Sequence, residues 1–321
     1  MTPQPQLIVN TDVPPSLART RPPERPPLRL GLVQERWHAD PDVHRDALAA
    51  GIRMAAGEGA RIVCLQELTL SRYFATTPEG PHAGGAEPED LATGPTVSFA
   101  AEMAVETGSY VHASLFERAD ASDGLGYNTA VIVAPDGRLV QRTRKLHIPI
   151  TAGYHEDKYF RQGPASEGDG PFPLIALPLG DDGGAQAQLG APTCWDQWFP
   201  ELARGYSLAG GEVLIFPTAI GSEPDHPEFD TEPLWQQVIV GNGVANGTFM
   251  VAINRTGVEE PLTFYGSSFI SDPYGRILVQ APRAEPAVLV ADLDLDQRRD
   301  WLELFPFLTT RRPDAYGSLV S

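Results

Sequence analysis

Two short, mostly apolar segments separated by a helical pattern constrain the fold of this chain more than any other feature. Leu28–Gln34 and Arg61–Gln66 have the composition of strands that are buried on both faces. Between them, Leu48, Ile52 and Ala55 recur at positions i, i+4 and i+7, which indicates one buried face of a helix. A strand, a helix and a strand in this order form a crossover between parallel strands. The sequence therefore predicts an α/β fold.

The same kinds of segment continue along the rest of the chain. Asn128–Ala134 and Leu139–Leu146 are joined by Pro135-Asp136-Gly137, which is typical of a hairpin turn. Ser267–Ser271 and Ile277–Gln280 form a second predicted hairpin. The other predicted elements are strands at Ser109–Phe116, Val213–Phe216 and Phe249–Ile253 and a helix at Leu234–Val244. Three long irregular segments are expected to form pocket walls or interfaces, namely Thr76–Glu89, Arg161–Gly170 and Gly221–Thr231.

The two ends of the chain differ from the segment between them. Residues 1–27 contain eight prolines, so they can neither nucleate a helix nor join the interior of a sheet. We expect an extended arm there, either a mobile tail or a strap across a partner subunit. Residues 28–298 form the single predicted domain. Residues 299–321 are a C-terminal extension, with apolar residues such as Phe305 and Phe307 that pack at an oligomer interface or wrap around their own domain.

The charge balance limits the partners of this protein. With 42 Asp and Glu against 24 Lys and Arg, the formal net charge is −18. Nucleic acids and anionic membranes both require a basic face, so we expect neither as a partner. The absence of an 18-residue apolar run and of a signal-peptide pattern favours a cytoplasmic protein. With only two cysteines and no His-Glu-x-x-His motif, we expect no metal and no cofactor.

The two cysteines differ in their sequence surroundings. Cys64 lies within a predicted buried strand, where a structural core thiol is expected. Cys194 follows the strand-like Gln188–Pro192 and precedes Pro200, which suits the first turn of a helix. In a strand-to-helix turn, backbone N–H groups point outward and can lower the pKa of a thiol or hold an oxyanion. Cys194 is therefore the candidate nucleophile.

Two further ionisable residues come at the ends of predicted strands. Glu67 directly follows Arg61–Gln66, and Lys145 ends the strand that begins at Leu139. The carboxyl ends of parallel strands are where α/β folds place ligand-binding and catalytic groups. A carboxylate, an ammonium group and a thiol can together deprotonate a nucleophile, stabilise a tetrahedral oxyanion and protonate departing ammonia. This set predicts attack on a carboxamide carbon.

Three sequence blocks resemble the carbon–nitrogen hydrolases of the nitrilase superfamily. The blocks are Leu65–Leu68, Arg144–Pro149 and Cys194–Glu201, and the resemblance covers roughly Leu28–Tyr316. It implies a four-layer α-β-β-α sandwich with a single domain. It also implies a homo-oligomer, because members of this family are commonly dimers built into larger assemblies.

The resemblance assigns roles to individual residues. It implies that Glu67 is the general base and acid and that Cys194 forms a thioester with the substrate. Lys145 and the backbone N–H of Trp195 would hold the oxyanion. Many members carry a second, assisting glutamate, which the matching segment places at Glu156.

Finer detail resembles the members that hydrolyse N-carbamoylputrescine. The segments that carry this likeness are Glu67–Phe74, His147–Phe160, Cys194–Trp198, Pro217–Pro224 and Arg311–Tyr316. A small N-carbamoyl compound is the expected substrate, and Trp195, Tyr73, His147 and Glu223 are the candidate substrate-binding residues. His147 can instead fix the loop beside Lys145 by hydrogen bonding. Glu223 begins an acidic run that either receives a cationic amine tail or is solvated surface.

Several alternatives stay open. Relatives that act on carbamoyl amino acids carry an arginine shortly after the catalytic cysteine to bind the carboxylate, and Cys194–Glu201 contains none. Parts of Thr231–Asn246 depart from the usual pattern, however, so N-carbamoyl-β-alanine remains a candidate substrate, with Arg72, Arg161 or Arg255 to bind its carboxylate. A nitrilase with the same thioester chemistry and a non-catalytic member of the fold are the other possibilities.

Overall fold

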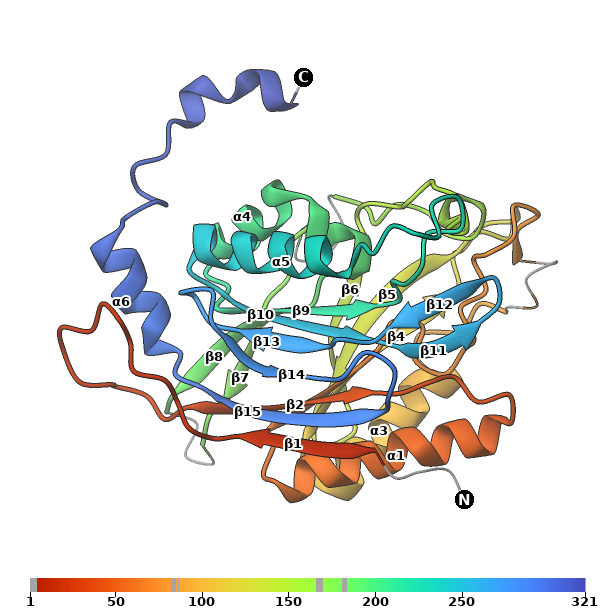
Figure 1. The fold of residues 1–321 in the computed structure, drawn as a ribbon, viewed down its shortest axis with the longest axis horizontal. Coiled ribbons are helices and arrows are strands. Elements are labelled where there is room, and N and C mark those ends of the chain that lie inside the picture. The colour runs from red at the N-terminus through yellow and green to blue at the C-terminus, as the bar shows by residue number, and fades with distance from the viewer. Residues whose placement is uncertain (1–4, 82–84, 86, 166–169, 181–183, 321) are drawn as a thin grey trace.

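Two mixed β-sheets lie face to face in the computed structural model, and each carries helices on its outer face (Figure 1). The structure describes residues 5–81, 85, 87–165, 170–180 and 184–320. The layers follow the order helices, sheet, sheet, helices. This confirms the four-layer α-β-β-α sandwich that the sequence resemblance implied.

The first sheet has seven strands in the order β1-β15-β2-β3-β4-β5-β6. Its strands are β1 (Gln6–Asn10), β2 (Leu28–Gln34), β3 (Ile62–Leu65), β4 (Tyr110–Glu117), β5 (Tyr127–Val133), β6 (Leu139–Arg144) and β15 (Ala287–Leu293). β2, β3 and β4 are parallel, whereas β5 and β6 continue the sheet as an antiparallel hairpin. Helices α1 (Pro41–Gly57) and α3 (Pro95–Thr107) pack on its outer face.

The second sheet has six strands in the order β14-β13-β10-β9-β8-β7. Its strands are β7 (Ile175–Pro178), β8 (Gln186–Gly190), β9 (Val213–Thr218), β10 (Phe249–Asn254), β13 (Phe269–Ser271) and β14 (Ile277–Gln280). Helices α4 (Pro200–Leu208) and α5 (Glu232–Asn246) cover its outer face. The remaining elements are the hairpin β11 (Thr256–Glu259) and β12 (Leu262–Tyr265), the helix α6 (Asp296–Leu304), and short 3-10 helices at Glu156–Lys158 (η1), Cys194–Trp198 (η2), Pro313–Ala315 (η3) and Gly317–Val320 (η4).

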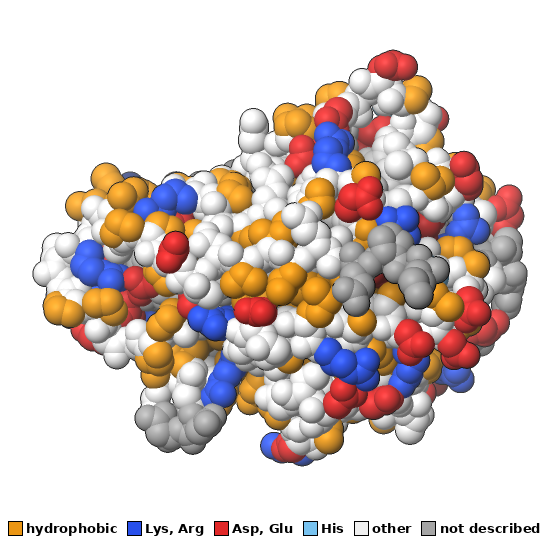
Figure 2. All heavy atoms as spheres, turned by 60° about the horizontal axis from the view of Figure 1, so that its bottom comes forward, with side chains coloured by type: hydrophobic (Ala, Val, Ile, Leu, Met, Phe, Trp, Pro, Cys, Tyr) orange, Lys and Arg blue, Asp and Glu red, His pale blue; other side chains and the backbone are white. Residues whose placement is uncertain are grey.

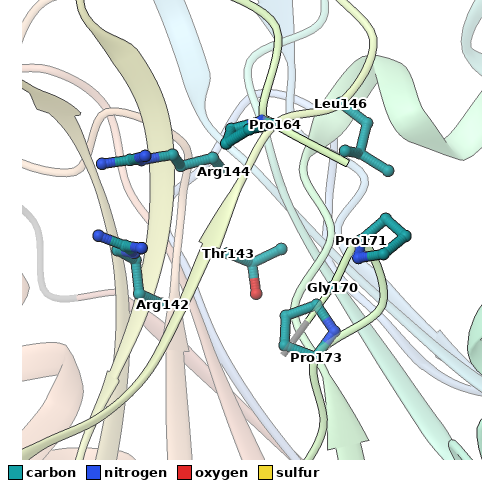
Figure 3. A pocket seen from close by; sticks show the side chains of 8 residues that line it. All are labelled: Arg142, Thr143, Arg144, Leu146, Pro164, Gly170, Pro171 and Pro173. Atoms are coloured by element: carbon teal, nitrogen blue, oxygen red, sulfur yellow. The ribbon is translucent and has the colours of Figure 1, made fainter. Parts of the chain in front are cut away.

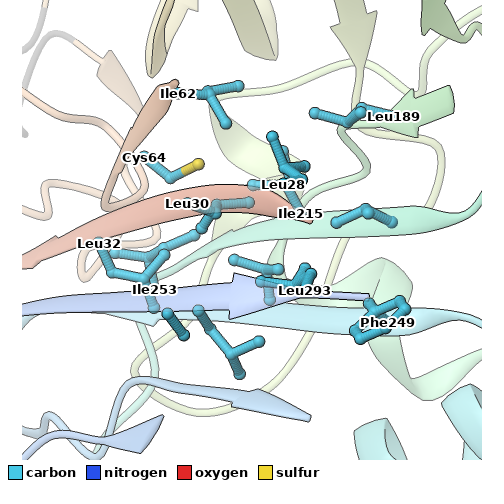
Figure 4. Close-up of a cluster of buried hydrophobic side chains, with 14 of the residues drawn as sticks. Leu28, Leu30, Leu32, Ile62, Cys64, Leu189, Ile215, Phe249, Ile253 and Leu293 are labelled. Atoms are coloured by element: carbon cyan, nitrogen blue, oxygen red, sulfur yellow. The ribbon is translucent and has the colours of Figure 1, made fainter. Parts of the chain in front are cut away.

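Apolar side chains from both sheets fill the space between them (Figure 4). Alternation along each strand decides which side chains enter this layer. In β3, Ile62 and Cys64 face the second sheet, whereas Val63 and Leu65 face α1 and α3. Burial raises the pKa of the Cys64 thiol well above its usual range, which leaves this cysteine as a neutral core residue.

Helix α1 shows how local sequence sets this packing. The Asp40 carboxylate accepts hydrogen bonds from the backbone N–H of Asp42 (3.0 Å) and of Val43 (3.3 Å), which caps the helix. α1 then lies very close to β2, because a Cβ atom on Gly31 would come within 2.7 Å of the Cβ of Ala55. Glycine at position 31 therefore permits the close approach of helix and sheet.

The strands and helices predicted from the sequence are all present, with ends shifted by a few residues. The elements that the sequence patterns did not predict are β1, β7, β11, β12, β15, α3 and α6. β15 is fully buried between β1 and β2, so its identity as a strand depends on pairing with segments far away in sequence.

The described part of the N-terminal arm packs on its own chain. β1 joins the edge of the first sheet parallel to β15. Arg19 donates to Asp300 (2.9 Å) and to Asp294, and Arg25 donates to Asp296 (2.9 Å). Residues 6–27 are thus an edge strand followed by a strap that is anchored on its own chain.

The C-terminal extension begins later than expected. α6 runs continuously across residue 298, so the predicted boundary lies inside a helix. After Leu304 the chain leads away from the sheets (Figure 1). The ring of Trp301 contacts those of Phe305 and Phe307, with centroid distances of 4.9 and 5.7 Å.

Basic and acidic side chains are interspersed on the face that Figure 2 brings forward. Ion pairs such as Arg53 with Glu106 and Arg45 with Glu102 join α1 to α3 at the surface. None of the helices in the described part of the chain has both the length and the apolar character needed to cross a membrane.

Candidate active site

Three side chains from distant parts of the sequence meet beyond the ends of β3 and β6. The Nζ atom of Lys145 lies 3.0 Å from Oε1 of Glu67 and 2.7 Å from Oε2 of Glu156. All three side chains are buried. A single ammonium group therefore holds two carboxylates beside the turn that carries Cys194.

The backbone is strained at two positions in this centre. Cys194 has φ +26° at the start of η2, and Leu68, which directly follows Glu67, has φ +50°. Residues other than glycine rarely adopt this left-handed region, and the cost is about 1–3 kcal/mol each. Such strain persists only where surrounding contacts enforce it, and it concentrates at functional sites.

Asp196 connects the turn that carries Cys194 with the one that carries Lys145. Its carboxylate accepts hydrogen bonds from the backbone N–H of Thr193 (3.2 Å) and of His147 (3.0 Å). It also pairs with Nδ1 of His147 at 2.7 Å. Asp196 was not among the predicted site residues, although an acidic residue three positions after Thr193 is a typical signal of a capped turn.

A cavity of about 350 Å³ opens over Cys194. Three segments form its wall, namely 149–156, 194–198 and 219–231. Among the described residues, its ionisable lining groups besides Cys194 are Tyr154, Glu156, Glu223 and His226, and none is an arginine or a lysine. The irregular segment Gly221–Thr231 thus forms part of a pocket wall, as its length suggested.

The predicted site residues occupy different places around this cavity. Glu156, Cys194, Trp195 and Glu223 line it, as do other aromatic residues of the wall. Glu67 and Lys145 lie behind the lining, fully buried.

Two predicted substrate-binding residues do not line the cavity. Tyr73 is fully buried, and its hydroxyl donates to Oε1 of Glu156 (3.0 Å) from behind. The ring of His147 stacks on that of Phe199, with centroids 3.7 Å apart, while it bonds Asp196. Tyr73 thus contacts Glu156 and His147 contacts Asp196, and direct contact of either side chain with substrate stays a prediction.

Arg255 is unavailable to a substrate carboxylate. It is fully buried and pairs with Glu259 at 2.7 Å. Its guanidinium also donates to the carbonyl oxygens of Glu67 (2.7 Å), Leu68 (3.2 Å) and Ser71 (3.1 Å). Arg255 therefore holds the turn after β3 in place.

The other two candidate arginines also lie outside the lining of this cavity. Arg72 donates to the carbonyl oxygen of Glu260, and Arg161 forms an ion pair with Asp123. The cavity over Cys194 is therefore lined by none of these three arginines.

The electrostatics keep the thiol and the lysine protonated. Burial raises the pKa of the Cys194 thiol well above its usual range, and the charge of Glu67 raises it further, while Lys145 opposes this. Burial alone would lower the pKa of Lys145, but the carboxylates of Glu156 and Glu67 outweigh it and raise that pKa. Burial also raises the pKa of Glu156, against the effect of Lys145.

A second pocket lies along β6, apart from this site (Figure 3). Arg142 and Arg144 point to one side of the strand and Thr143 to the other. Its volume of about 40 Å³ has room for little more than ordered water. Among the described residues, no group of three or more His, Cys, Asp or Glu side chains is arranged to hold a metal ion.

Known proteins share both the sequence and the fold of this chain. Residues 29–303 match the family model described as carbon-nitrogen hydrolase. The chain is 36% identical to an N-carbamoylputrescine amidase of Arabidopsis thaliana over 84% of this chain and 87% of that protein. It is 34% identical to a citrullinase of Francisella tularensis over 91% of this chain and 98% of that protein. The crystal structure of a carbon-nitrogen hydrolase from Helicobacter pylori is 29% identical, with a TM-score of 0.75 over 92% of this chain and 99% of that one.

Proposed function

The chain belongs to the carbon–nitrogen hydrolase family, and we propose that it hydrolyses an N-carbamoyl amine, with N-carbamoylputrescine as its leading substrate. The observation that carries this proposal is the charge of the cavity over Cys194. Glu223 offers a carboxylate there, and no arginine or lysine is among the described lining residues. An ammonium group at the far end of a substrate would be attracted to such a wall, whereas a carboxylate would be repelled.

We assign the bond-making steps to Cys194, Glu67 and Lys145. The Cys194 sulfur attacks the ureido carbonyl carbon while Glu67 takes the thiol proton. Lys145 and the backbone N–H of Trp195 stabilise the resulting oxyanion. When this intermediate collapses, the terminal amino group takes the proton from Glu67 and leaves as ammonia, so that a thioester remains on Cys194.

Water completes the cycle. Glu67 removes a proton from water as the oxygen bonds to the thioester carbon, and the proton returns to the departing sulfur of Cys194. The product is a carbamic acid, which loses CO2 and leaves the free amine. Glu156 lines the cavity and accepts a hydrogen bond from Lys145, so its proposed role is to orient that ammonium group and to help position the substrate.

The raised pKa of the thiol supports this division of roles. A thiol that stays protonated near neutral pH is a weak nucleophile and needs a base at the moment of attack. Glu67 is the carboxylate whose charge acts most strongly on that thiol. Proton transfer to Glu67 would remove this unfavourable pair of negative charges as the thiolate forms.

Other substrates of the family fit this cavity less well. N-carbamoyl-β-alanine carries only a carboxylate at its far end. Citrulline carries both an amino group and a carboxylate at its far end. Either carboxylate would meet Glu223, and none of the candidate arginines lines the cavity. A nitrile would use the same thioester chemistry without needing Glu223.

The test compares ammonia release from N-carbamoylputrescine and from butylurea, its neutral analogue without the terminal amine. We expect Glu223→Gln to lower kcat/KM for N-carbamoylputrescine on the order of 10- to 100-fold, which corresponds to losing one charge-assisted hydrogen bond. The same variant should change kcat/KM for butylurea only about 3-fold or less, because butylurea has no charge for Glu223 to bind. Cys194→Ala serves as the blank.

N-carbamoyl-β-alanine, citrulline and a simple aliphatic nitrile complete the panel. Faster turnover of any of these three by the wild-type enzyme would overturn the proposed substrate. An equal effect of Glu223→Gln on both ureas would overturn the role of Glu223.

We further propose that the enzyme is a cytoplasmic homo-oligomer, with residues 1–27 as an arm on its own domain and the C-terminal extension packed against a second copy. Support for the location is that Cys64 and Cys194 are both free thiols. Support for the interface is the exposure of large apolar side chains in the extension, including Phe305 (47%) and Leu319 (68%). Light scattering of the full chain and of a chain ending at Leu304 tests this, since the shorter chain should lose subunits.

A further inference from the structure

The two oxygens of the Glu67 carboxylate have different surroundings. Oε1 accepts two hydrogen bonds, from Nζ of Lys145 (3.0 Å) and from Nδ2 of Asn128 (2.7 Å). Oε2 is buried and has no hydrogen-bond partner among the described residues. A buried carboxylate oxygen without a hydrogen-bond donor costs free energy, so the unpaired Oε2 needs a functional explanation.

Asn128 occupies a position from which it reaches two members of the centre. Its side-chain amide donates to Glu67, while its backbone carbonyl accepts the N–H of Lys145 (2.8 Å). Both Asn128 and Glu67 are fully buried, so neither contact competes with water. A single residue at the start of β5 thereby connects the end of β3 with the end of β6.

The orientation of the Asn128 amide follows from its partners. A carboxylate only accepts hydrogen bonds, so the NH2 group must face Glu67. On the other side, the hydroxyl of Ser114 lies 3.4 Å from Oδ1 of Asn128 and also accepts the backbone N–H of Leu68 (3.1 Å). The amide is therefore held at both ends.

We propose that Asn128 is a positioning residue that occupies Oε1 of Glu67 and thereby leaves Oε2 as the atom that exchanges protons. This inference rests on the proposed function, in which Glu67 is the base. Lys145 could satisfy Oε1 alone, but one flexible ammonium group would not prevent rotation of the carboxylate about its terminal bond. The amide of Asn128, anchored on a central strand, prevents that rotation.

Oε2 would take up one proton and release one proton in the formation of the thioester. As the sulfur of Cys194 bonds to the substrate carbon, Oε2 takes the proton from the thiol. It then gives that proton to the nitrogen of the departing ammonia. If the carboxylate turned partway about its terminal bond, neither oxygen would keep the position that Oε2 holds in this structure.

Kinetics of Asn128→Ala test this inference, with Thr129→Val as the matched control. Thr129 is the next residue of β5, equally buried, and its hydroxyl donates to Glu117 (2.6 Å) rather than to the site. We expect Asn128→Ala to lower kcat on the order of 10²-fold, the effect of misplacing a catalytic group by about 1 Å, with KM within a few-fold of wild type. Thr129→Val should lower the melting temperature to a similar extent and keep kcat. A kcat for Asn128→Ala within 3-fold of that of the control would overturn the inference.

A second readout needs no substrate. The rate at which acrylamide alkylates Cys194, followed by mass spectrometry, reports how readily Glu67 takes the thiol proton, and Cys64 is too deeply buried to interfere. We expect Asn128→Ala to slow this reaction toward the rate of Glu67→Gln, while Thr129→Val stays at the wild-type rate. Alkylation of Asn128→Ala or of Glu67→Gln at the wild-type rate would overturn the inference. If the wild-type enzyme released no ammonia from N-carbamoylputrescine, the proposed substrate would be overturned, but the inference about Asn128 would not.

Asn128→Asp keeps the shape of the side chain, so it tests the same positioning role if the alanine variant fails to fold. An ionised aspartate would repel Glu67, whereas a protonated one can donate the missing hydrogen bond. We expect its kcat to be low at pH 8 and to recover as the pH is lowered, relative to wild type. A pH profile parallel to that of wild type would contradict the positioning role.

Discussion

Two sides of the cavity over Cys194 are held in different ways. On one side lies the buried centre of Glu67, Lys145 and Glu156, where almost every polar atom has a protein partner. On the other side lies the loop wall, Gly221–Thr231, where the side-chain carboxylate of Glu223 accepts a hydrogen bond from the hydroxyl of Thr231 (3.2 Å). The buried centre is enforced by contacts from several strands. The loop wall is anchored at its start, where Gly221 donates to the hydroxyl of Tyr154 (3.1 Å) and Ser222 donates to the carbonyl oxygen of Thr263 (2.8 Å), and beyond that it depends on its own turns and on exposed side chains.

This contrast indicates how an enzyme can keep one reaction while its substrate changes. Groups that make and break bonds must be held to within fractions of an ångström, which requires buried, mutually dependent contacts. A group that binds the far end of a substrate tolerates more freedom, and a surface loop can change without disturbing the core. Substitutions in the buried centre should therefore cost far more than the same chemical change in the loop wall.

The largest effect is expected when the nucleophile is removed. Cys194→Ala should lower kcat on the order of 10⁶-fold, as the loss of a covalent nucleophile does in other hydrolases. The free energy of unfolding should stay within about 1 kcal/mol of wild type, because Cys194 borders a cavity and its removal leaves no new void in the core. Ammonia release and chemical denaturation measure the two quantities. Residual turnover above 1% of wild type would show that another group can act as nucleophile.

The sequence predicted the buried centre better than the loop wall, and the reason is physical. Glu67 and Lys145 follow β3 and β6, which run in the same direction in the first sheet, and Cys194 follows β8 of the second sheet. The apolar pattern identifies these strands, and their ends bring the three residues together. Glu223 lies in an irregular segment with several other acidic residues, and no local rule says which of them faces the cavity. Long-range contacts such as that between Arg255 and the carbonyl of Glu67 leave no signal in a single sequence.

The next largest effect is expected when the contacts between Arg255 and the turn after Glu67 are removed. Arg255→Met should lower the free energy of unfolding by about 3–5 kcal/mol, because it leaves buried Glu259 without its partner. It should also lower kcat, because the turn after Glu67 loses three hydrogen bonds. The measurement is denaturant unfolding combined with steady-state kinetics.

Arg283→Met is the matched control, because Arg283 contacts the loop wall through its ion pair with Asp230. Arg283 makes a bidentate ion pair with Asp230, but both side chains are about half exposed, so the loss should be about 1 kcal/mol or less. Equal losses in the two variants would contradict the contrast between the walls, since the same chemical change would then cost the same on both sides.

The smallest effect, and the one that isolates the loop wall, is the pH dependence of substrate binding. Burial raises the pKa of Glu223, so this carboxylate loses its charge at a higher pH than an exposed glutamate does. The ammonium of N-carbamoylputrescine stays charged throughout, so its advantage over butylurea should shrink as the pH falls. The ratio of kcat/KM for the two ureas is the quantity to measure, because titration of the buried centre affects both equally and cancels.

His226 also lines this wall and would repel the ammonium once protonated, so His226→Gln is measured in parallel. As the pH is lowered, this ratio of kcat/KM values should decrease in wild type and in His226→Gln. It should stay constant in Glu223→Gln. A ratio independent of pH in all three would mean that the ammonium group binds elsewhere, and a fall abolished only by His226→Gln would assign the discrimination to the histidine.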